Sequence, residues 1–125
     1  YKGVHIDSTI TPIREGLVIL NADRITEQNL PSVFKTWDKI WISKDEIVAQ
    51  SFYGYPYASL YIALNLLTIN PQLVVCDPKQ TYIRKQLERY KVESIGVDLR
   101  HSRTLGGGHH CVTLDLVRGE YFRNE

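Results

Sequence analysis

Short apolar blocks separated by polar segments run along the chain, and their order predicts an α/β fold. Residues 17–20 form a continuous apolar run, LVIL, that ends at Asn21, which is typical of a buried strand. Residues 39–42 predict another strand, and residues 28–37 fit a short helix with Pro31 in its first turn. The first half therefore predicts a strand, a helix and a second strand.

The second half of the chain predicts a hairpin followed by a helix. Residues 60–69 are rich in β-forming side chains, and a turn signal at 70–71, Asn-Pro, separates them from the apolar run 73–76. The aspartate and proline at 77–78 match an N-cap followed by proline at the first helical position. We therefore expect a helix from there to about Tyr90.

Beyond that helix the pattern indicates a strand, a loop and a final strand. Residues 92–99 alternate between apolar and polar, residues 100–108 are loop-like, and residues 111–117 return to the pattern of a strand. We therefore expect Cys111 to stand at the start of a strand, held by a rigid element and accessible through an open loop.

The two halves echo one another. The segment 17–21, LVILN, resembles 73–77, LVVCD, and each is followed by an expected helix and strand. The offset of about 55 residues lies in the range of repeat architectures. The echo favours strand-strand-helix-strand units at about 1–58 and 59–125, although chance similarity between two α/β stretches is the alternative. Since two such units leave faces uncovered, we expect further units to close the core.

Composition excludes several classes of function. With 125 residues, 43% of them hydrophobic and 23% charged, the chain has the size and balance of one globular domain or part of one. A net charge of +1, with lysine and arginine spread along the chain, gives no nucleic-acid footprint. No apolar run approaches the ~18 residues that a membrane span needs. We therefore expect neither nucleic acid nor a membrane among its partners.

The number and spacing of the cysteines indicate the redox compartment of the protein, and its first residue indicates whether the chain is part of a longer protein. Cys76 and Cys111 are too few and too far apart for a disulfide framework, which favours a reduced, cytoplasmic setting. Cys76 lies within an apolar run, and we expect it to be buried and inert. The chain starts at Tyr1 without an initiator methionine or a signal-peptide pattern, so we expect it to be part of a longer protein.

The segment 105–113, LGGGHHCVT, is the strongest candidate for chemistry. Three glycines permit backbone conformations closed to other residues and let a ligand approach the main chain. The thiolate of Cys111 behind them is a potential nucleophile. The alternative is an ordinary turn followed by a buried cysteine that acts as a small apolar side chain.

Three other kinds of site fit this segment poorly. A phosphate-binding loop needs Lys-Ser or Lys-Thr after its glycines and a helix to follow, and a dinucleotide fingerprint is absent. A metal site is disfavoured because neighbouring strand residues point to opposite faces, which leaves only His109 and Cys111 on one side. We therefore expect neither a metal nor a cofactor.

Charged residues near the N-terminus supply a second candidate site. His5 and Asp7 would share a face of an extended segment, where the carboxylate could orient the imidazole for general acid/base catalysis. The alternative is an ordinary surface histidine and a turn aspartate. Arg24 could bind a carboxylate through two parallel hydrogen bonds, or it could be a solvated turn residue.

Taken together, these segments resemble the amidinotransferase family, and glycine amidinotransferases in particular, within the superfamily of guanidino-modifying enzymes. Residues 5–9, HIDST, are similar to the family's His-x-Asp-x-Thr motif. Residues 16–24, GLVILNADR, resemble its Gly-apolar-Asn-Pro-Asp-Arg segment, with Ala22 in place of the proline. Residues 105–115 resemble its Leu-Gly-Gly-Gly-x-His-Cys-x-Thr-x-Asp segment. A match to the motif at one end of the chain alone is weak evidence for the family, but both motifs in this order and at this spacing are specific to it.

The resemblance covers nearly the whole chain and implies a fold. Polar residues between the motifs also fall at fitting positions: Ser59, Asn65 and Asp77. The implied fold is the pentein-type α/β propeller, a ring of five ββαβ units, of which this chain would supply about two as the C-terminal part. The acidic residues that hold the guanidinium group in the family would precede Tyr1. His109 replaces a more usual apolar or aromatic residue, which allows a different substrate.

The resemblance also implies a mechanism. Cys111 would attack the guanidinium carbon of an arginine-like donor and form a covalent amidino-cysteine, while His5 protonates the departing amine. Asp7 would orient His5 or help to bind the substrate. An amine acceptor, deprotonated by His5, would then take the amidino group.

The remaining site residues implied by the family contact the donor. Arg24 and Ser59 resemble the residues that hold its carboxylate, and Gly107 and Gly108 would leave room for the flat amidino group. A small-molecule guanidino donor and an amine acceptor are therefore the expected partners. Self-association into a homo-oligomer stays open.

Two alternative functions are left open by the sequence. If water replaces the amine, the same site becomes an arginine deiminase or a dimethylarginine-type hydrolase. The segment 21–24 and the tail with Asp115 and Arg118 favour transfer. The other alternative is a non-catalytic interaction module built from the same repeat, and the presence of cysteine, histidine and aspartate together argues against it.

Overall fold

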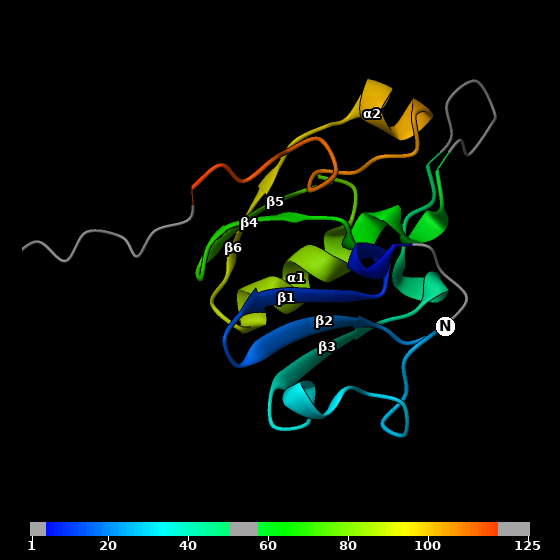
Figure 1. Cartoon of the computed structure of the whole chain (residues 1–125). Coiled ribbons are helices and arrows are strands. Elements are labelled where there is room, and N and C mark those ends of the chain that lie inside the picture. The colour runs from blue at the N-terminus through cyan, green and yellow to red at the C-terminus, as the bar shows by residue number, and fades with distance from the viewer. Residues whose placement is uncertain (1–4, 51–57, 118–125) are drawn as a thin grey trace, which may run out of the picture.

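The computed structural model describes residues 5–50 and 58–117, and these form two three-stranded sheets with helices beside them (Figure 1). The first sheet contains β1 (Ile10–Arg14), β2 (Leu17–Asn21) and β3 (Asp38–Ile42). The second contains β4 (Leu67–Asn70), β5 (Leu73–Cys76) and β6 (Glu93–Gly96). The helices are α1 (Thr81–Arg89) and α2 (Arg100–Thr104), with 3-10 turns η1 (Ile6–Ser8), η2 (Ser32–Phe34), η3 (Lys44–Glu46) and η4 (Leu60–Leu64). None of the helices in these ranges is long and apolar enough to cross a membrane.

Both sheets have the same strand order and directions. β1 pairs antiparallel with β2, β2 pairs parallel with β3, and β4, β5 and β6 repeat these relations. In the parallel pairs Leu17 lies opposite Asp38, and Leu73 lies opposite Glu93. The two segments that echo one another in the sequence are therefore the central strands of two similarly built sheets. The predicted α/β class is confirmed.

The two sheets share one apolar core. β2 is buried along its whole length, as expected of a continuous apolar run that is covered on both faces. Its residues Leu17 and Ile19 pack into a cluster that draws on both sheets and on α1, among them Val74, Ile83 and Leu87. Each such side chain stabilises the fold by about 1.5–3 kcal/mol when it is fully buried. The other face of the first sheet packs in a second cluster: Ile10, Val18, Leu20, Ile25 and Leu30, with Phe34, Trp37 and Trp41 against it.

α1 presents the apolar face that its sequence predicts. Ile83 and Leu87, four positions apart, are both fully buried. The helix begins later than predicted, at Thr81, because Asp77 does not cap it. The Asp77 carboxylate instead accepts a hydrogen bond from the Lys79 N–H at 3.0 Å, which closes a turn before the helix starts.

The helix predicted over 28–37 is wrong, since only the 3-10 turn η2 forms there. The Asn29 side chain accepts a hydrogen bond from the Thr26 N–H at 2.7 Å and donates one to the Arg24 carbonyl at 3.0 Å. These local bonds satisfy backbone groups in a turn conformation and so compete with a helix.

Two further predicted elements differ in their extent. The strand expected over 60–69 begins as the 3-10 helix η4, and only its last part is β4. Apolar side chains of η4, Ala63 and Leu64, are nonetheless buried in the shared core, so the apolar pattern alone could not separate helix from strand. Part of the expected loop over 100–108 is the short helix α2.

The final strand, predicted over 111–117, is also wrong. The described residues after α2 form turns and coil, and Cys111 is exposed. Backbone groups in this segment bond locally instead, as the Thr113 N–H does to the His110 carbonyl at 3.0 Å. A strand needs a partner for its hydrogen-bond ladder, and alternation of side chains alone does not supply one.

Candidate active site

Cys111 and Asp7 lie together although 104 positions separate them. The Cys111 Sγ is 3.8 Å from the Asp7 Oδ2. Asp7 belongs to η1 at the N-terminal side of β1. Cys111 lies in the turn that follows residues 106–108, which we call the glycine segment. Cys111 is exposed whereas Cys76 is buried in β5, and burial raises the pKa of the Cys76 thiol. Of the two thiols, Cys111 is the one placed for chemistry.

Asn65 connects these two residues. It is 1% exposed and lies between η4 and β4. Its Nδ2 donates to the Asp7 Oδ2 at 2.6 Å, and its Oδ1 accepts from the N–H groups of His110 at 3.0 Å and Cys111 at 3.1 Å. Its backbone carbonyl accepts from the His109 N–H at 2.9 Å. The turn that carries the thiol is therefore bound to Asn65 at three successive positions.

The predicted glycine residues are placed by close contacts. A Cβ at Gly108 would lie 2.6 Å from the Asn65 Oδ1, so only glycine lets the backbone approach the amide this closely. A Cβ at Gly107 would lie 3.3 Å from the Cys111 Cβ. Gly106 has φ of +83°, a conformation that other residues rarely adopt. The glycines thus shape the turn around Asn65 and Cys111.

Two histidines lie near the Asp7 carboxylate: His110 is close to it in space, and His5 is close to it in the sequence. The His110 Nδ1 is 3.5 Å from the Asp7 Oδ2, and its side chain is 54% exposed. His5 lies directly before η1 and is exposed. The expected extended segment at His5 is wrong from Ile6 onward, because Ile6–Ser8 form a 3-10 turn; alternation therefore does not place His5 and Asp7 on one face. The pairing of His5 with Cys111 stays a prediction.

Arg24 is held beside η1 rather than in solvent. Its Nη1 donates to the Ser8 Oγ at 3.1 Å and to the Thr9 Oγ1 at 2.8 Å. Its guanidinium carbon lies 4.6 Å from the centre of the Tyr61 ring, an arrangement that favours a cation–π interaction. The guanidinium is therefore fixed next to the residue that follows Asp7.

Tyr61 and Ser59 complete this side of the site. The Tyr61 hydroxyl donates to the Asp23 Oδ2 at 2.9 Å; burial, and then this hydrogen bond to a carboxylate, raises the pKa of Tyr61. Ser59 is the exposed N-cap of η4, and its Oγ accepts from the Tyr61 N–H at 3.3 Å. Ser59 thus lies beside the tyrosine on which Arg24 stacks. Arg118, which the sequence linked to transfer, lies outside the described residues.

A buried ion pair holds α2, the helix that directly precedes the glycines at 106–108. Asp77, 2% exposed, accepts from the Arg103 Nη2 at 2.7 Å and from the Gln80 Nε2 at 2.9 Å. Burial by itself raises the pKa of Asp77, but hydrogen bonds from Gln80 and Lys79, and then the charge of Arg103, hold that pKa below its usual value. α2, which carries Arg103, is thereby tied to the end of β5.

His109 fixes the other end of the glycine segment. It is 4% exposed, and its Nε2 lies 2.7 Å from the Val97 carbonyl oxygen, which accepts a hydrogen bond from the Nε2–H. Burial lowers the pKa of His109 in spite of this hydrogen bond. In the described part of the chain no group of three or more His, Cys, Asp and Glu side chains is arranged to hold a metal ion.

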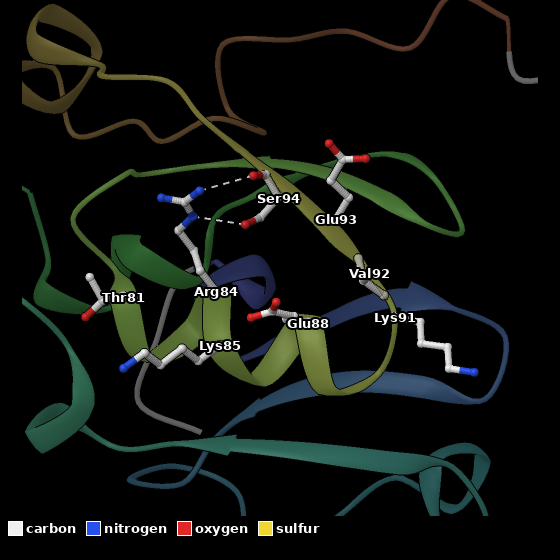
Figure 2. Close-up of a pocket in the computed structure, with 8 residues that line it drawn as sticks. All are labelled: Thr81, Arg84, Lys85, Glu88, Lys91, Val92, Glu93 and Ser94. Carbon is white, nitrogen blue, oxygen red and sulfur yellow. Dashed lines mark hydrogen bonds between the residues drawn. The ribbon is translucent and has the colours of Figure 1, made fainter.

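A pocket of about 600 Å³ lies elsewhere, between α1 and β6 (Figure 2). Within it the Arg84 Nε donates to the Ser94 Oγ at 2.9 Å, and the Nη2 donates to the Ser94 carbonyl at 3.3 Å. Most residues around it have charged or polar side chains, with both signs present, and their apolar stems and Val92 contribute to the lining: Thr81, Arg84, Lys85, Glu88, Lys91, Val92, Glu93 and Ser94. This pocket contains neither a thiol nor an imidazole, so we place the candidate active site at Cys111.

Sequence reasoning undervalued Asn65 and missed His110 and Tyr61 as parts of the site. The signal for Asn65 was present, since it interrupts an apolar run between Leu64 and Leu66. A buried amide needs hydrogen-bond partners, so such an interruption points to a specific tertiary contact. The identity of the partners depends on residues far away in the chain.

Sequence comparison relates the chain to proteins of known activity. No model of a protein family matches it. It is 42% identical over 119 residues to inosamine-phosphate amidinotransferase 1 of Streptomyces griseus, a match that covers 94% of this chain and 34% of that protein. It is 32% identical over 124 residues to the mitochondrial glycine amidinotransferase of Xenopus laevis, covering 96% of this chain and 29% of that protein. The chain thus spans about a third of the length of these curated relatives and matches their C-terminal portion.

Comparison with solved structures agrees. The structure of inosamine-phosphate amidinotransferase from Streptomyces griseus superposes with a TM-score of 0.85 and 40% identity over 96% of this chain and 34% of that one. A dimethylarginine dimethylaminohydrolase superposes with a TM-score of 0.64 over 89% of this chain and 37% of that one. At 17% identity this second match shows a likeness of fold alone.

Proposed function

This chain is a homologue of the amidinotransferases and corresponds to the C-terminal portion of those proteins, and on that premise we propose that its parent protein transfers an amidino group from an arginine-like donor to an amine. The observation that carries the proposal is the 3.8 Å contact between the Cys111 Sγ and the Asp7 Oδ2. It joins the two sequence motifs in one exposed site. A nucleophile next to a carboxylate suits a cationic, planar substrate.

The first half-reaction begins at Cys111. Its thiolate attacks the guanidinium carbon, a C–S bond forms, and the C–N bond to the rest of the donor breaks. The departing amine takes a proton, for which His5 is the proposed acid. The product of this step is an amidino-cysteine. Asp7 supports the step by holding an N–H of the guanidinium close to the sulfur, since its Oδ2 lies beside Cys111.

The second half-reaction reverses these roles. An acceptor amine, deprotonated by His5, attacks the amidino carbon, and the C–S bond breaks to restore the thiolate of Cys111. Arg24 and Ser59 are the proposed ligands of the donor's carboxylate, since Arg24 is fixed beside η1 and Ser59 lies near its stacking partner. Gly107 and Gly108 are the proposed backbone neighbours of the amidino group: the space for a Cβ at Gly107 borders the Cys111 Cβ, while Gly108 lets the turn approach Asn65.

The proposed whole molecule is a pentein ring. In this proposal the two sheets of equal strand order belong to two of its five units, one at about residues 1–58 and the other at about 59–125. The share of the relative that this chain covers, 34%, is close to what two units would occupy. The likeness to a dimethylarginine dimethylaminohydrolase supports a fold common to both activities.

A product assay on the full-length protein tests the proposal. With an arginine-like donor and an amine, we expect a new guanidino compound together with the amine left from the donor. Formation of citrulline at the same rate with and without the amine would show a hydrolase instead. No reaction with any guanidino donor, in a folded protein, would favour the non-catalytic module.

The nucleophile is tested by a matched pair of variants. Cys111→Ser should lower transfer at least about 1,000-fold, because a serine hydroxyl is a far weaker nucleophile without a strong base. Cys76→Ser removes the buried thiol and should leave the rate within about twofold, with at most a modest loss of stability. Substantial turnover by Cys111→Ser would place the nucleophile elsewhere.

A further inference from the structure

Asn65 makes more contacts with the candidate site than any role in the proposed chemistry requires. We propose that Asn65 is a positioning residue, whose carboxamide holds the Cys111 turn against the Asp7 carboxylate so that thiol and substrate-binding group stay aligned. The proposal deepens the proposed function and rests on it for its kinetic part. The placement of the Cys111 thiol can be tested without substrate, through the reactivity of the thiol, and that test does not depend on the proposed function.

The hydrogen bonds of Asn65 account for the shape of the turn. Its Oδ1 accepts from both His110 and Cys111, and its backbone carbonyl accepts from His109. The N–H groups of residues 109–111 are therefore satisfied by one residue rather than by a strand ladder. Because backbone N–H groups need partners, the turn keeps its conformation only while Asn65 is in place.

The chemistry of the partners fixes the orientation of the amide. A carboxylate only accepts hydrogen bonds, so the group that faces Asp7 at 2.6 Å must be the NH₂ of Asn65. The carbonyl oxygen then faces the two backbone N–H groups. An aspartate at position 65 has the same shape and could serve those N–H groups, but it would set a second carboxylate against Asp7.

The surroundings leave the amide little freedom. Asn65 is 1% exposed, and its own N–H donates to the Ile62 carbonyl at 3.0 Å. Its neighbours Leu64 and Leu66 are buried in the shared core. On the other side the backbone of Gly108 lies directly on the amide, where a Cβ would come within 2.6 Å of the Oδ1. The amide is therefore held by the core on one side and the glycine segment on the other.

This arrangement bears on the rate of the proposed reaction. A guanidinium bound by Asp7 presents its carbon to Cys111 only if the two side chains keep their separation of 3.8 Å. A misplacement of about 1 Å can slow such a step roughly 100-fold. The loss should fall mainly on kcat, since the proposed ligands of the donor's carboxylate, Arg24 and Ser59, bond other residues than Asn65.

Two variants of the full-length protein test the proposal. Asn65→Asp keeps the shape and the acceptor but removes the donor to Asp7, and Gly108→Ala forces the backbone away from the amide. We expect each to lower kcat by roughly 10–100-fold while KM for the donor changes far less. Asn70→Asp is the matched control and should leave both constants unchanged, because the Asn70 Oδ1 accepts from the turn N–H of Gln72 at 2.8 Å and bonds none of the site residues in the part of the chain that the structure describes.

A second readout needs no substrate. We would follow alkylation of Cys111 by iodoacetamide against pH in a Cys76→Ser background. In Gly108→Ala, which adds no charge, displacement of the Cys111 turn from its place beside Asp7 should change the alkylation profile relative to the wild-type protein. A merely structural role would lower activity in step with the folded fraction and leave this profile in place.

The outcomes separate the two proposals. If the wild-type protein transfers no amidino group, the proposed function fails. The positioning role of Asn65 is then decided by the alkylation profile alone. If folded Asn65→Asp and Gly108→Ala alkylate and turn over like the wild-type protein, the positioning role is overturned. Should Asn65→Asp fail to fold, the same two measurements on Gly108→Ala decide between these outcomes.

Discussion

At the scale of single residues, the Asp7 Oδ2 is the atom on which the contacts of the site converge. The thiol of Cys111, the amide of Asn65 and the imidazole of His110 all approach it. A carboxylate beside a nucleophile can receive a guanidinium group. The exposure of Cys111 leaves that position open to a small molecule.

The two cysteines should differ strongly in reactivity. Cys111 is exposed, while Cys76 is buried and burial raises its pKa. In the folded protein we expect iodoacetamide to label Cys111 at least about tenfold faster than Cys76, as located by peptide mass spectrometry. Equal labelling of both thiols in the native protein would contradict the burial of β5.

His109 should make stability depend on pH. Its folded-state pKa is lowered by burial, so below its unfolded pKa of about 6.5 the unfolded chain binds a proton that the folded chain does not. The free energy of unfolding should therefore fall as pH drops from about 6.5 toward the lowered value. His109→Phe removes this dependence but loses the bond to Val97, which costs about 1 kcal/mol at pH 8. Urea unfolding of both proteins at pH 8 and pH 5 checks this, and parallel changes in the two would contradict it.

At the scale of elements, the apolar runs of the central strands and the face of α1 could be predicted because each is encoded locally. β2 and β5 are short, continuous runs, and Ile83 and Leu87 mark the face of a helix. The late start of α1 could not be predicted, since the Asp77 side chain is taken up by contacts made after folding. Nor could the absence of a strand at 111–117, because pairing is a tertiary property.

The same limit applies to the site. The motif residues Cys111 and Asp7 could be singled out from the sequence, and the structure places them in contact. The role of Asn65 could not, since its partners at 7, 110 and 111 lie 45 or more positions away. His5 stays a prediction as the acid and base.

The ion pair between α2 and β5 should contribute measurably to stability. Arg103→Gln leaves the nearly buried Asp77 carboxylate without its cation, which should lower the free energy of unfolding by about 3 kcal/mol near pH 7. The pKa of Asp77 is lowered in the folded state, so this contribution is present above its unfolded pKa of about 3.9 and is lost as pH falls through the lowered value.

Denaturant unfolding of the full-length protein measures this effect. Arg89→Gln, on the exposed side of α1, is the matched control and should change stability by less than about 0.5 kcal/mol. Equal effects of the two substitutions would show that the Asp77–Arg103 pair does not hold α2.

At the scale of the whole molecule, two sheets with one shared core form only part of what the relatives contain. The chain spans about a third of their length. Several large apolar side chains near the end of the described residues are more than half exposed: Val112, Leu114, Leu116 and Val117. Such a surface is typical of an interface with further parts of a protein.

Residues 1–125 produced alone should therefore associate or fold weakly and should show no amidino transfer. Exposed apolar surface favours self-association, and the chain spans only about a third of the length of the amidinotransferases that it matches. Sedimentation and the product assay measure both points. A stable monomer with the turnover of the full-length protein would contradict this expectation.

The proposed covalent intermediate can be sought directly in the mass of the protein during turnover. Full-length protein mixed with a donor labelled with ¹³C in its guanidino carbon, without acceptor, is quenched in acid and mapped by peptide mass spectrometry. We predict one labelled amidino group on Cys111, which disappears when an amine is added before the quench and reappears in a guanidino product. Turnover with no label on Cys111, or with the label on another residue, would contradict transfer through this thiol.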